Sequence, residues 1–385
     1  MKIALSTDDL GLFFEPRHTA LAARLREVLE GGAPFSKPDD PATVAAEMGG
    51  RLGLYEHLVP AAGAPIDVRS LVLIREALGQ VSPLADAIFA VQGLGSYPIV
   101  IAGTEAQKAA LLPGVVAGER IGAFGLTEPE AGSDVASLRT TARRDGDSWI
   151  LDGEKTLISN VPIAHHHVVF ANADPSLGRK GITAFLVERG AEGLETKPIP
   201  MSANHPLGRL VMRGCRVPDA ARIGDIGRGF AIAMQTLDAF RISVGAAANG
   251  MAWRALQLAT EHVKRRSQFG KPLAEQQMVQ AMLADMATEL DAARLLVLRA
   301  AHKKDTAASA ASSRATTEVA MAKMFATEAA QRIIDRAVQL HGGAGVTLET
   351  EVEHLYREIR PLRIYEGTTE IQKLIIARAL LSGDA

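Results

Sequence analysis

Two polar turns in this chain carry residue types suited to acid–base chemistry. The later turn reads Tyr365-Glu366-Gly367-Thr368 and places a carboxylate on an aromatic–glycine turn at the mouth of a predicted helix. The earlier turn, residues 127–134, reads Thr-Glu-Pro-Glu-Ala-Gly-Ser-Asp and lies where the local pattern changes from helix to strand. A carboxylate becomes a competent base when desolvation raises its pKa toward the working pH. We therefore interpret Glu366 as a general base.

Four further segments stand out, and three of them, the earlier turn, the segment at Arg266 and residues 339–345, suit a ligand with a flat ring and a pyrophosphate. Around the earlier turn, Pro129 stops a strand and Gly132 permits a tight turn with free backbone amides. Residues 155–160 (Lys-Thr-Leu-Ile-Ser-Asn) end a predicted strand. Arg266 begins Arg-Ser-Gln-Phe-Gly-Lys-Pro-Leu in a break between two helices, and a planar guanidinium can bind a pyrophosphate through paired hydrogen bonds. At residues 339–345 a long helix ends in glycines that leave room for a ligand against the backbone.

Taken in chain order, these five segments resemble the acyl-CoA dehydrogenase family of flavoenzymes over nearly the whole chain. The resemblance implies an FAD-dependent enzyme that desaturates an acyl-CoA thioester to the trans-2-enoyl-CoA. Glu366 would remove the α-proton, hydride would leave the β-carbon for flavin N5, and an electron-transfer flavoprotein would take the electrons. Because the two C–H bonds break on opposite sides of the acyl chain, base and flavin must sandwich it. A homotetramer, or alternatively a dimer, and a role in catabolism of fatty or organic acids are also implied.

The same resemblance assigns binding residues. Those that it places against FAD are Phe124, Leu126, Thr127, Ser133, Leu157, Ile158, Ser159, Arg266, Gln268, Phe269, Gln277, Gln339, Gly342, Gly343, Thr368 and Glu370. Those that it places against acyl-CoA are Ser133, Asp238, Arg241, Gly367 and, more remotely, Arg378. The Ser159 hydroxyl is expected to donate toward N5, and the loop at Arg266 to reach the FAD of a neighbouring subunit. The floor of the acyl pocket is expected within residues 86–96.

Two positions depart from the family pattern. Leu157 stands where the family usually has an aromatic residue, which affects the shielding of the flavin and the approach of the electron acceptor; alternatively, Leu157 is an ordinary core residue. Phe240 stands where some relatives carry their base on an earlier helix, and phenylalanine cannot take a proton. This favours Glu366 as the base. Asp238 and Arg241 alternatively form a structural helix pair at i,i+3 spacing.

Hydrophobic periodicity predicts an α+β fold that is mostly α. Helical spacing, as at Leu21, Leu25 and Leu29, gives way near residue 121 to short β-rich runs bounded by turn residues, and returns from residue 227. We predict an N-terminal helical domain (1–120), a middle β-domain (121–226) and a C-terminal helical bundle (227–385). The apolar stripes predicted for the bundle are Val279, Met282, Leu283, Met286, Leu290, Ala293 and Val297, and then Met321, Met324, Phe325 and Ala329.

Composition gives no electrostatic reason to expect nucleic acid or an anionic membrane as a partner. The 385 residues are 47% hydrophobic and 22% charged, with a formal charge of −2. The apolar runs are too short for a bilayer span, which needs about 20 residues. The single cysteine, Cys215, cannot form an internal disulfide, and Met1-Lys2-Ile3-Ala4 lacks the features of a secretory signal. We expect a cytoplasmic protein.

Three other interpretations were weighed against this one. His165-His166-His167 invites a metal site, but neighbouring strand residues point to opposite faces and no carboxylate cluster completes it, so no metal is predicted. A flavin oxidase that returns electrons to oxygen is the rival within the fold, although acyl-CoA oxidases are usually longer and nitroalkane oxidases carry aspartate in place of Glu366. A catalytically silent acyl-CoA-binding protein is the rival of another class, and the retained Glu366 argues against it.

Overall fold

The computed structural model describes residues 5–7, 10–30, 40–61, 64–307 and 315–382, so the sequence start, Met1 to Ala4, lies outside the described residues. The helices are α1 (Pro16–Glu30), α2 (Pro41–Gly50), α3 (Val68–Val81), α4 (Pro83–Ala102), α5 (Glu105–Val116), α6 (Gly229–Arg265), α7 (Gln277–Asp305), α8 (Thr316–His341), α9 (Glu351–Ile359) and α10 (Thr369–Ser382). The strands are β1 (Gly122–Gly125), β2 (Thr141–Asp145), β3 (Ser148–Ser159), β4 (His166–Asn172), β5 (Ile182–Glu188), β6 (Leu194–Pro198), β7 (Leu207–Pro218), β8 (Arg222–Ile223), β9 (Ser267–Gln268) and β10 (Lys271–Pro272). The predicted class, helical parts flanking a β part, is confirmed.

The chain divides into two compact units, and neither is continuous in sequence. Unit 1 comprises residues 1–36, 67–86 and 241–385, whereas unit 2 comprises residues 37–66 and 87–240. Helices α4 and α6 therefore each begin in one unit and end in the other.

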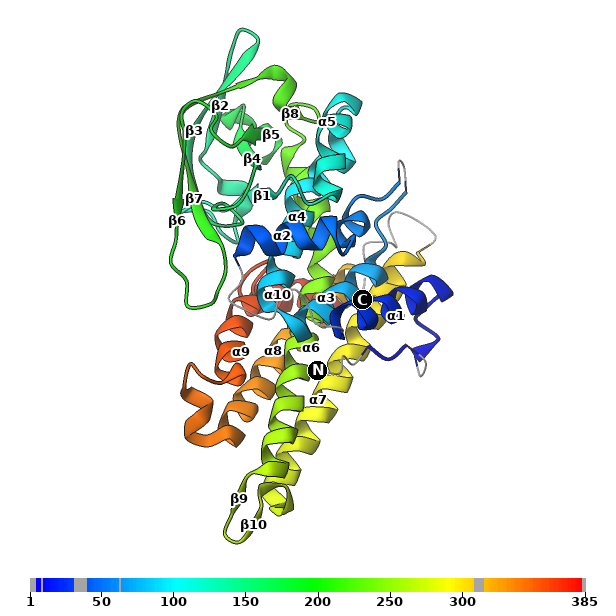
Figure 1. Ribbon diagram of the computed structural model, residues 1–385. Coiled ribbons are helices and arrows are strands. Elements are labelled where there is room, and N and C mark those ends of the chain that lie inside the picture. Colours follow the sequence, from blue (N-terminus) through cyan, green and yellow to red (C-terminus); the bar gives the residue numbers. More distant parts are fainter. Residues whose placement is uncertain (1–4, 8–9, 31–39, 62–63, 308–314, 383–385) are drawn as a thin grey trace. The chain divides into compact units, whose positions relative to one another are not determined.

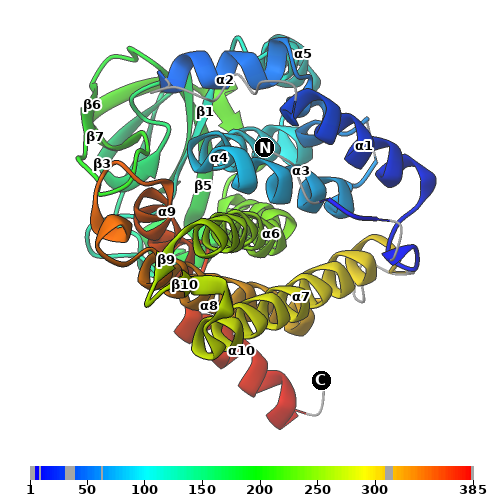
Figure 2. The same ribbon diagram turned by 60° about the horizontal axis from the view of Figure 1, so that its bottom comes forward.

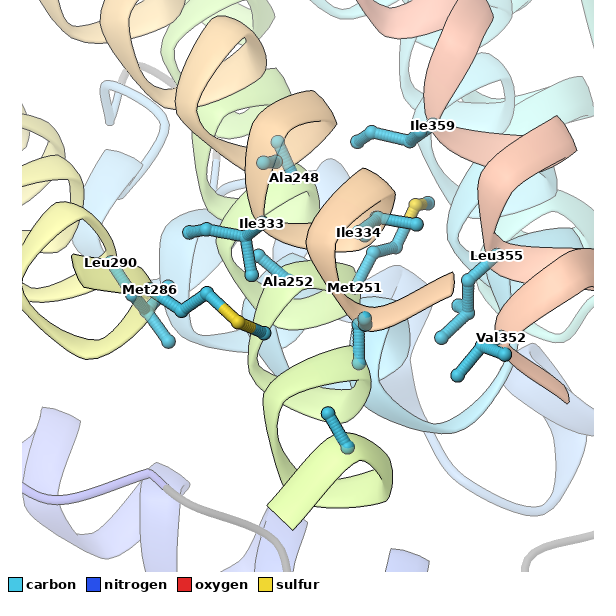
Figure 3. Packing of buried hydrophobic residues seen from close by; sticks show 14 of the residues in the cluster. Ala248, Met251, Ala252, Met286, Leu290, Ile333, Ile334, Val352, Leu355 and Ile359 are labelled. Atoms are coloured by element: carbon cyan, nitrogen blue, oxygen red, sulfur yellow. The ribbon is translucent and has the colours of Figure 1, made fainter. Parts of the chain in front are cut away.

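Unit 1 is a helical bundle in which α6, α7 and α8 lie side by side (Figure 2). Small residues permit this close packing: a Cβ at Gly245 of α6 would lie 2.8 Å from Val297 Cγ2 and 3.3 Å from Ala326 Cβ. Figure 3 shows Ile333 and Ile334 of α8 among the buried apolar side chains contributed by α6, α7 and α9. The hairpin of β9 and β10 joins the C-terminal end of α6 to the N-terminal end of α7 (Figure 1).

The apolar stripe predicted on α7 is buried from Met286 onward, but the one predicted on α8 is largely wrong. Met321, Met324 and Phe325 are only half-buried. The fully buried face of α8 is formed mainly by alanines, together with Ile333 and Ile334. Alanine lets helix backbones approach closely, so the larger side chains rotate to the edge of the interface.

Capping carboxylates fix the start of α3, the helix that carries Arg75 into unit 1. Asp67 accepts a hydrogen bond from the backbone N–H of Ser70 at 3.2 Å. Asp305, at the end of α7, accepts from the N–H groups of Val68 and Arg69 at 3.0 and 2.9 Å. These bonds satisfy amides that the first helical turn leaves without partners.

Unit 2 is built on an eight-stranded sheet with strand order β6-β7-β3-β2-β4-β5-β8, and β1 pairs with β4. Strand β4 is buried along its whole length. Strands β6, β7 and β3 lie side by side at one end of the sheet (Figure 1). The pairing of β3 with β7 shifts register between Lys155 and Ile158, and this irregularity falls in a segment predicted to bind the cofactor.

The prediction that the apolar runs are too short for a bilayer span is wrong for α4, which among the described residues is the one helix long and apolar enough to qualify by length and composition. Of its apolar stretch, 83% is buried within the protein, which is the pattern of a core helix.

Candidate active site

The turn that carries Glu366 has an unusual backbone conformation. Glu366 has φ of 53° and Gly367 has φ of 92°, so both lie in the left-handed region. A left-handed non-glycine residue costs roughly 1–2 kcal/mol. Two cationic side chains, the half-buried Arg241 and the buried Lys323, hold the turn in place: Arg241 Nε donates to the Glu366 carbonyl at 3.0 Å, and Lys323 Nζ donates to the Gly367 carbonyl at 2.8 Å. The strain is therefore fixed by cations on α6 and α8.

The Glu366 carboxyl group is desolvated. Although part of the residue remains accessible, Oε2 is buried and has no hydrogen-bond partner among the described atoms. Burial raises the pKa of Glu366, and the nearby Arg75, Arg241 and Lys323 cations oppose that rise without cancelling it. A carboxylate with a raised pKa and an unused lone pair is suited to accept a proton.

Lys323 is a fully buried cation that sequence reasoning missed. Burial lowers the pKa of Lys323 to about 8, against the attraction of Glu366, which raises it. The sequence does contain a signal for a buried lysine, because Lys323 lies on the alanine-lined face of α8. A lysine within an otherwise apolar helix face is rarely buried without a partner.

In unit 2, a buried ion pair underlies the turn at residues 127–134. Lys155 Nζ donates to Glu128 Oε1 at 2.6 Å and to the Leu126 carbonyl at 3.3 Å. Glu128 also accepts from the backbone N–H groups of Arg139 and Thr140. Burial lowers the pKa of Lys155 to about 8, while its own hydrogen bonds and Lys155 hold the pKa of Glu128 below its usual value despite burial. Both groups are charged at neutral pH, and together they fix the turn to β3.

Next to this pair, β3 exposes Leu157. Its φ is 56°, it lies in the break between Lys155 and Ile158 where β3 leaves its register with β7, and 59% of it is accessible. The alternative that Leu157 is a core residue is therefore wrong. A large exposed apolar side chain on a left-handed backbone is a costly feature, so it points to a ligand or partner that covers it.

His205 is a second residue that the sequence did not single out. Its Nε2 lies 2.6 Å from Ser159 Oγ, within hydrogen-bond distance. Burial lowers the pKa of His205 to about 4, so the ring is neutral at physiological pH. His205 follows β6 in the loop that returns to β7, and only the pairing of β3 with β7 brings this loop to Ser159.

We expect NMR titration of the ring nitrogens to find His205 neutral at about pH 6, where an ordinary histidine with a pKa of about 6.5 is mostly protonated. The resonance would be assigned from its loss in His205→Asn. A titration midpoint at the ordinary histidine value would contradict the buried Ser159–His205 contact.

The remaining predicted cofactor residues of unit 2 vary in exposure. Phe124 packs edge-on against Phe170, with ring centroids 5.0 Å apart, so its ring belongs to the core. Leu126 and Ile158 are also buried, Thr127 is half-buried and Ser133 is exposed. Asp238, predicted to contact acyl-CoA, is half-buried on α6.

The predicted residues of unit 1 fall in three places. Arg266, Gln268, Phe269 and Gln277 are exposed on or beside the β9–β10 hairpin. Gln339, Gly342 and Gly343 are exposed at the end of α8. The two places are linked, because His262 of α6 stacks on His341 of α8 with centroids 4.3 Å apart. Thr368 is half-buried in the Glu366 turn, whereas Glu370 and Arg378 are exposed on α10.

The three consecutive histidines bind backbone groups. His165 Nδ1 accepts from the N–H of Ile121, His166 Nε2 lies 3.2 Å from the Gly95 carbonyl, and His167 Nδ1 lies 3.2 Å from the Val187 carbonyl. No group of three or more metal-ligating side chains occurs in the part of the chain that the structure describes.

Models of one protein family match three successive parts of the chain. Family models for the acyl-CoA dehydrogenase N-terminal, middle and C-terminal domains match residues 18–119, 123–215 and 227–381. The human mitochondrial short-chain specific acyl-CoA dehydrogenase is 41% identical, over 89% of this chain and 83% of its own. A subunit of the caffeyl-CoA reductase-Etf complex of Acetobacterium woodii is 37% identical, over 86% of this chain and 88% of its own.

Solved structures of acyl-CoA dehydrogenases also superpose on the chain. Butyryl-CoA dehydrogenase of Megasphaera elsdenii superposes with a TM-score of 0.86 at 34% identity, covering 96% of this chain and 99% of its own. An acyl-CoA dehydrogenase of Bacillus anthracis, solved in complex with FAD, superposes with a TM-score of 0.86 at 29% identity, covering 100% of this chain and 70% of its own. The chain therefore belongs to the acyl-CoA dehydrogenase family of FAD-dependent oxidoreductases.

Proposed function

We propose that this enzyme desaturates an acyl-CoA thioester between its α and β carbons, with Glu366 as the base that takes the α-proton. The observation that carries the proposal is the buried Oε2 of Glu366, which has no partner among the described atoms and lies on a left-handed turn fixed by Arg241 and Lys323. A structural carboxylate would use its oxygens for hydrogen bonds. This one keeps an acceptor free.

The residues predicted to hold FAD fit a large cofactor with a flat ring and a pyrophosphate. Leu157 is exposed where β3 leaves its register with β7, and Phe269 is 95% exposed at φ of 52° on the β9–β10 hairpin. At Gly342 and Gly343 an added Cβ would meet no atom within 4 Å, so the end of α8 leaves open space against its backbone. Arg266 beside the hairpin offers a guanidinium for the pyrophosphate.

Each part of the chain then has a role in the proposed reaction. Glu366 removes the α-proton, and its backbone amide donates to the thioester oxygen, where negative charge develops. The Glu128–Lys155 pair holds the turn from Leu126 to Ser133 in the position that binds the cofactor. FAD, when bound, supplies the acceptor for the hydride that leaves the β-carbon. Asp238, Arg241 and Gly367 orient the thioester relative to Glu366.

The reverse reaction, reduction of a 2-enoyl-CoA, is the second candidate. The 37% identical relative from Acetobacterium woodii is named as part of a reductase, and this observation supports it. The same carboxyl group would then give a proton to the α-carbon, because a base in one direction is an acid in the other. Assays in both directions distinguish which one the enzyme favours.

The proposed partners are an acyl-CoA substrate and an electron-transfer flavoprotein, since that relative is named as part of an Etf complex. We also propose a homotetramer. The support for assembly is the exposed Phe269, because an aromatic ring so fully exposed on a hairpin suits contact with a second subunit or its cofactor.

Anaerobic addition of acyl-CoA thioesters to the purified yellow protein tests the function. We expect the flavin absorbance to bleach with at least one thioester of a panel that varies in chain length and branching. Colour should return on addition of electron-transfer flavoprotein and only slowly in air. Rapid return of colour in air alone would favour an oxidase, and failure of every thioester and every enoyl-CoA to change the flavin would refute the proposal.

A further inference from the structure

An ion pair sealed from solvent lies in unit 1 beside the Glu366 turn. Arg75 of α3 donates from Nε and Nη2 to the two carboxylate oxygens of Asp86, both at 2.8 Å. Its Nη1 donates to Ser243 Oγ at 3.0 Å. The side chains of Arg75 and Asp86 are 0% and 1% exposed.

Stability alone does not explain such a pair. Removing two charges from water costs several kcal/mol per ion even when they are paired, and apolar replacements of similar volume are often neutral or stabilising. A pair that is retained at this cost, next to a base, suggests a role in the chemistry of that base.

The charged groups that act on Glu366 come from four helices. Arg75 of α3, Arg241 of α6 and Lys323 of α8 are positive, whereas Asp86 of α4 is negative. Among the described residues, these groups and Glu366 itself comprise three cations and two carboxylates, which leaves one positive charge in surplus. Of these four groups, Arg75 has the largest effect on the pKa of Glu366, which it lowers. Asp86 has the smallest effect, and it raises that pKa. Tyr365 adds no charge, because burial raises the pKa of its hydroxyl far above the physiological range.

We propose that the Arg75–Asp86 pair positions and maintains the charge of Glu366: Arg75 keeps the buried carboxylate ionised through its field, while Asp86 keeps Arg75 from binding that carboxylate directly. The bidentate bond to Asp86 fixes the orientation of the guanidinium, and the bond to Ser243 uses a third of its five N–H groups. Oε2 of Glu366 consequently stays without a hydrogen bond and can accept a substrate proton. A free arginine in the same place would form its own pair with Glu366 and consume that lone pair.

The inference rests on the proposed function, since it gives a purpose to the ionised state of Glu366. It can be tested independently of that function, however, because the charge of Glu366 can be measured whether or not Glu366 is the base. Arg75 and Asp86 are positioning residues in this account, and they act on the substrate only through Glu366.

The test is an infrared titration of the Glu366 carboxyl group in the FAD-loaded enzyme. The band of the protonated acid would be assigned from its loss in Glu366→Gln, and its midpoint compared in Arg75→Met and Asp86→Asn. Loss of the cation should move the midpoint to higher pH by about one pH unit, and loss of the anion should move it to lower pH by a smaller amount. Opposite shifts are diagnostic, because general loosening of the fold would move both midpoints the same way.

Ser243→Ala is the matched control, since it removes one hydrogen bond from Arg75 but keeps both charges and the bidentate bond to Asp86, and its midpoint should stay close to that of the unaltered enzyme. If Arg75→Met does not fold, Asp86→Asn decides alone: a downward shift supports the proposal, and an unchanged or raised midpoint overturns it. Midpoints that shift as expected while Glu366→Gln still reduces its flavin at full rate would refute the proposed function and leave the electrostatic proposal intact.

Discussion

Glu366→Gln is expected to slow reduction of the flavin by acyl-CoA about 10²- to 10⁴-fold, the contribution typical of a general base. Glutamine has nearly the same shape but cannot take a proton, and the turn should survive because its hydrogen bonds to Arg241 and Lys323 use backbone carbonyls. FAD content and thioester binding should therefore be kept. Anaerobic stopped-flow absorbance measures the rate, and a binding titration measures the affinity.

Glu349→Gln provides the matched control, because Glu349 is an exposed glutamate of unit 1 outside the Glu366 turn. It should reduce its flavin at the rate of the unaltered enzyme. If Glu366→Gln did the same, Glu366 would lose its role as the base.

Lys155→Met should produce a large loss of stability. The change leaves Glu128 as a buried charge without its cation, and breaking such a pair typically costs about 3–5 kcal/mol in the free energy of unfolding. The turn from Leu126 to Ser133 would also lose its anchor on the Leu126 carbonyl. We expect denaturant unfolding of the FAD-free protein to show the lost stability, and gel filtration of the loaded protein to show released FAD.

Two further variants make this result specific. Lys197→Met removes an exposed lysine paired with Glu195, and surface pairs of this kind contribute about 0–1 kcal/mol. The double change Lys155→Met and Glu128→Gln removes both buried charges, keeps a side-chain acceptor for the amides of Arg139 and Thr140, and should recover much of the stability lost in the single variant. Equal stability of Lys155→Met and Lys197→Met would show that the buried pair does not hold the turn.

Much of the fold could be predicted because its signals are local. The periods of the apolar residues change near residue 121 and again near residue 227, and the structure shows helices, strands and helices in that order. The prediction of the buried face of α8 was wrong for a physical reason. The alanines and the methionines of α8 both recur at helical spacing, and only the neighbouring helices decide which face is buried.

At the candidate site, the sequence indicated the turns but not what supports them. Glu366 and Lys155 lie in recognisable segments, whereas their partners come from far along the chain. Arg241 and Lys323 meet the Glu366 turn across 125 and 44 residues, and His205 meets Ser159 across 46 residues. Such pairs depend on which helix faces or loops meet, which a single sequence does not fix.

Hydrogen exchange at the α-carbon of an acyl-CoA thioester tests most directly whether Glu366 takes the α-proton. A thioester with sulfur in place of the β-carbon can lose its α-proton but cannot give hydride, so incubation with the FAD-loaded enzyme in D₂O isolates the proton step. Mass spectrometry should find deuterium at the α-carbon with the unaltered enzyme and almost none with Glu366→Gln. Equal deuterium incorporation by both proteins would contradict the account.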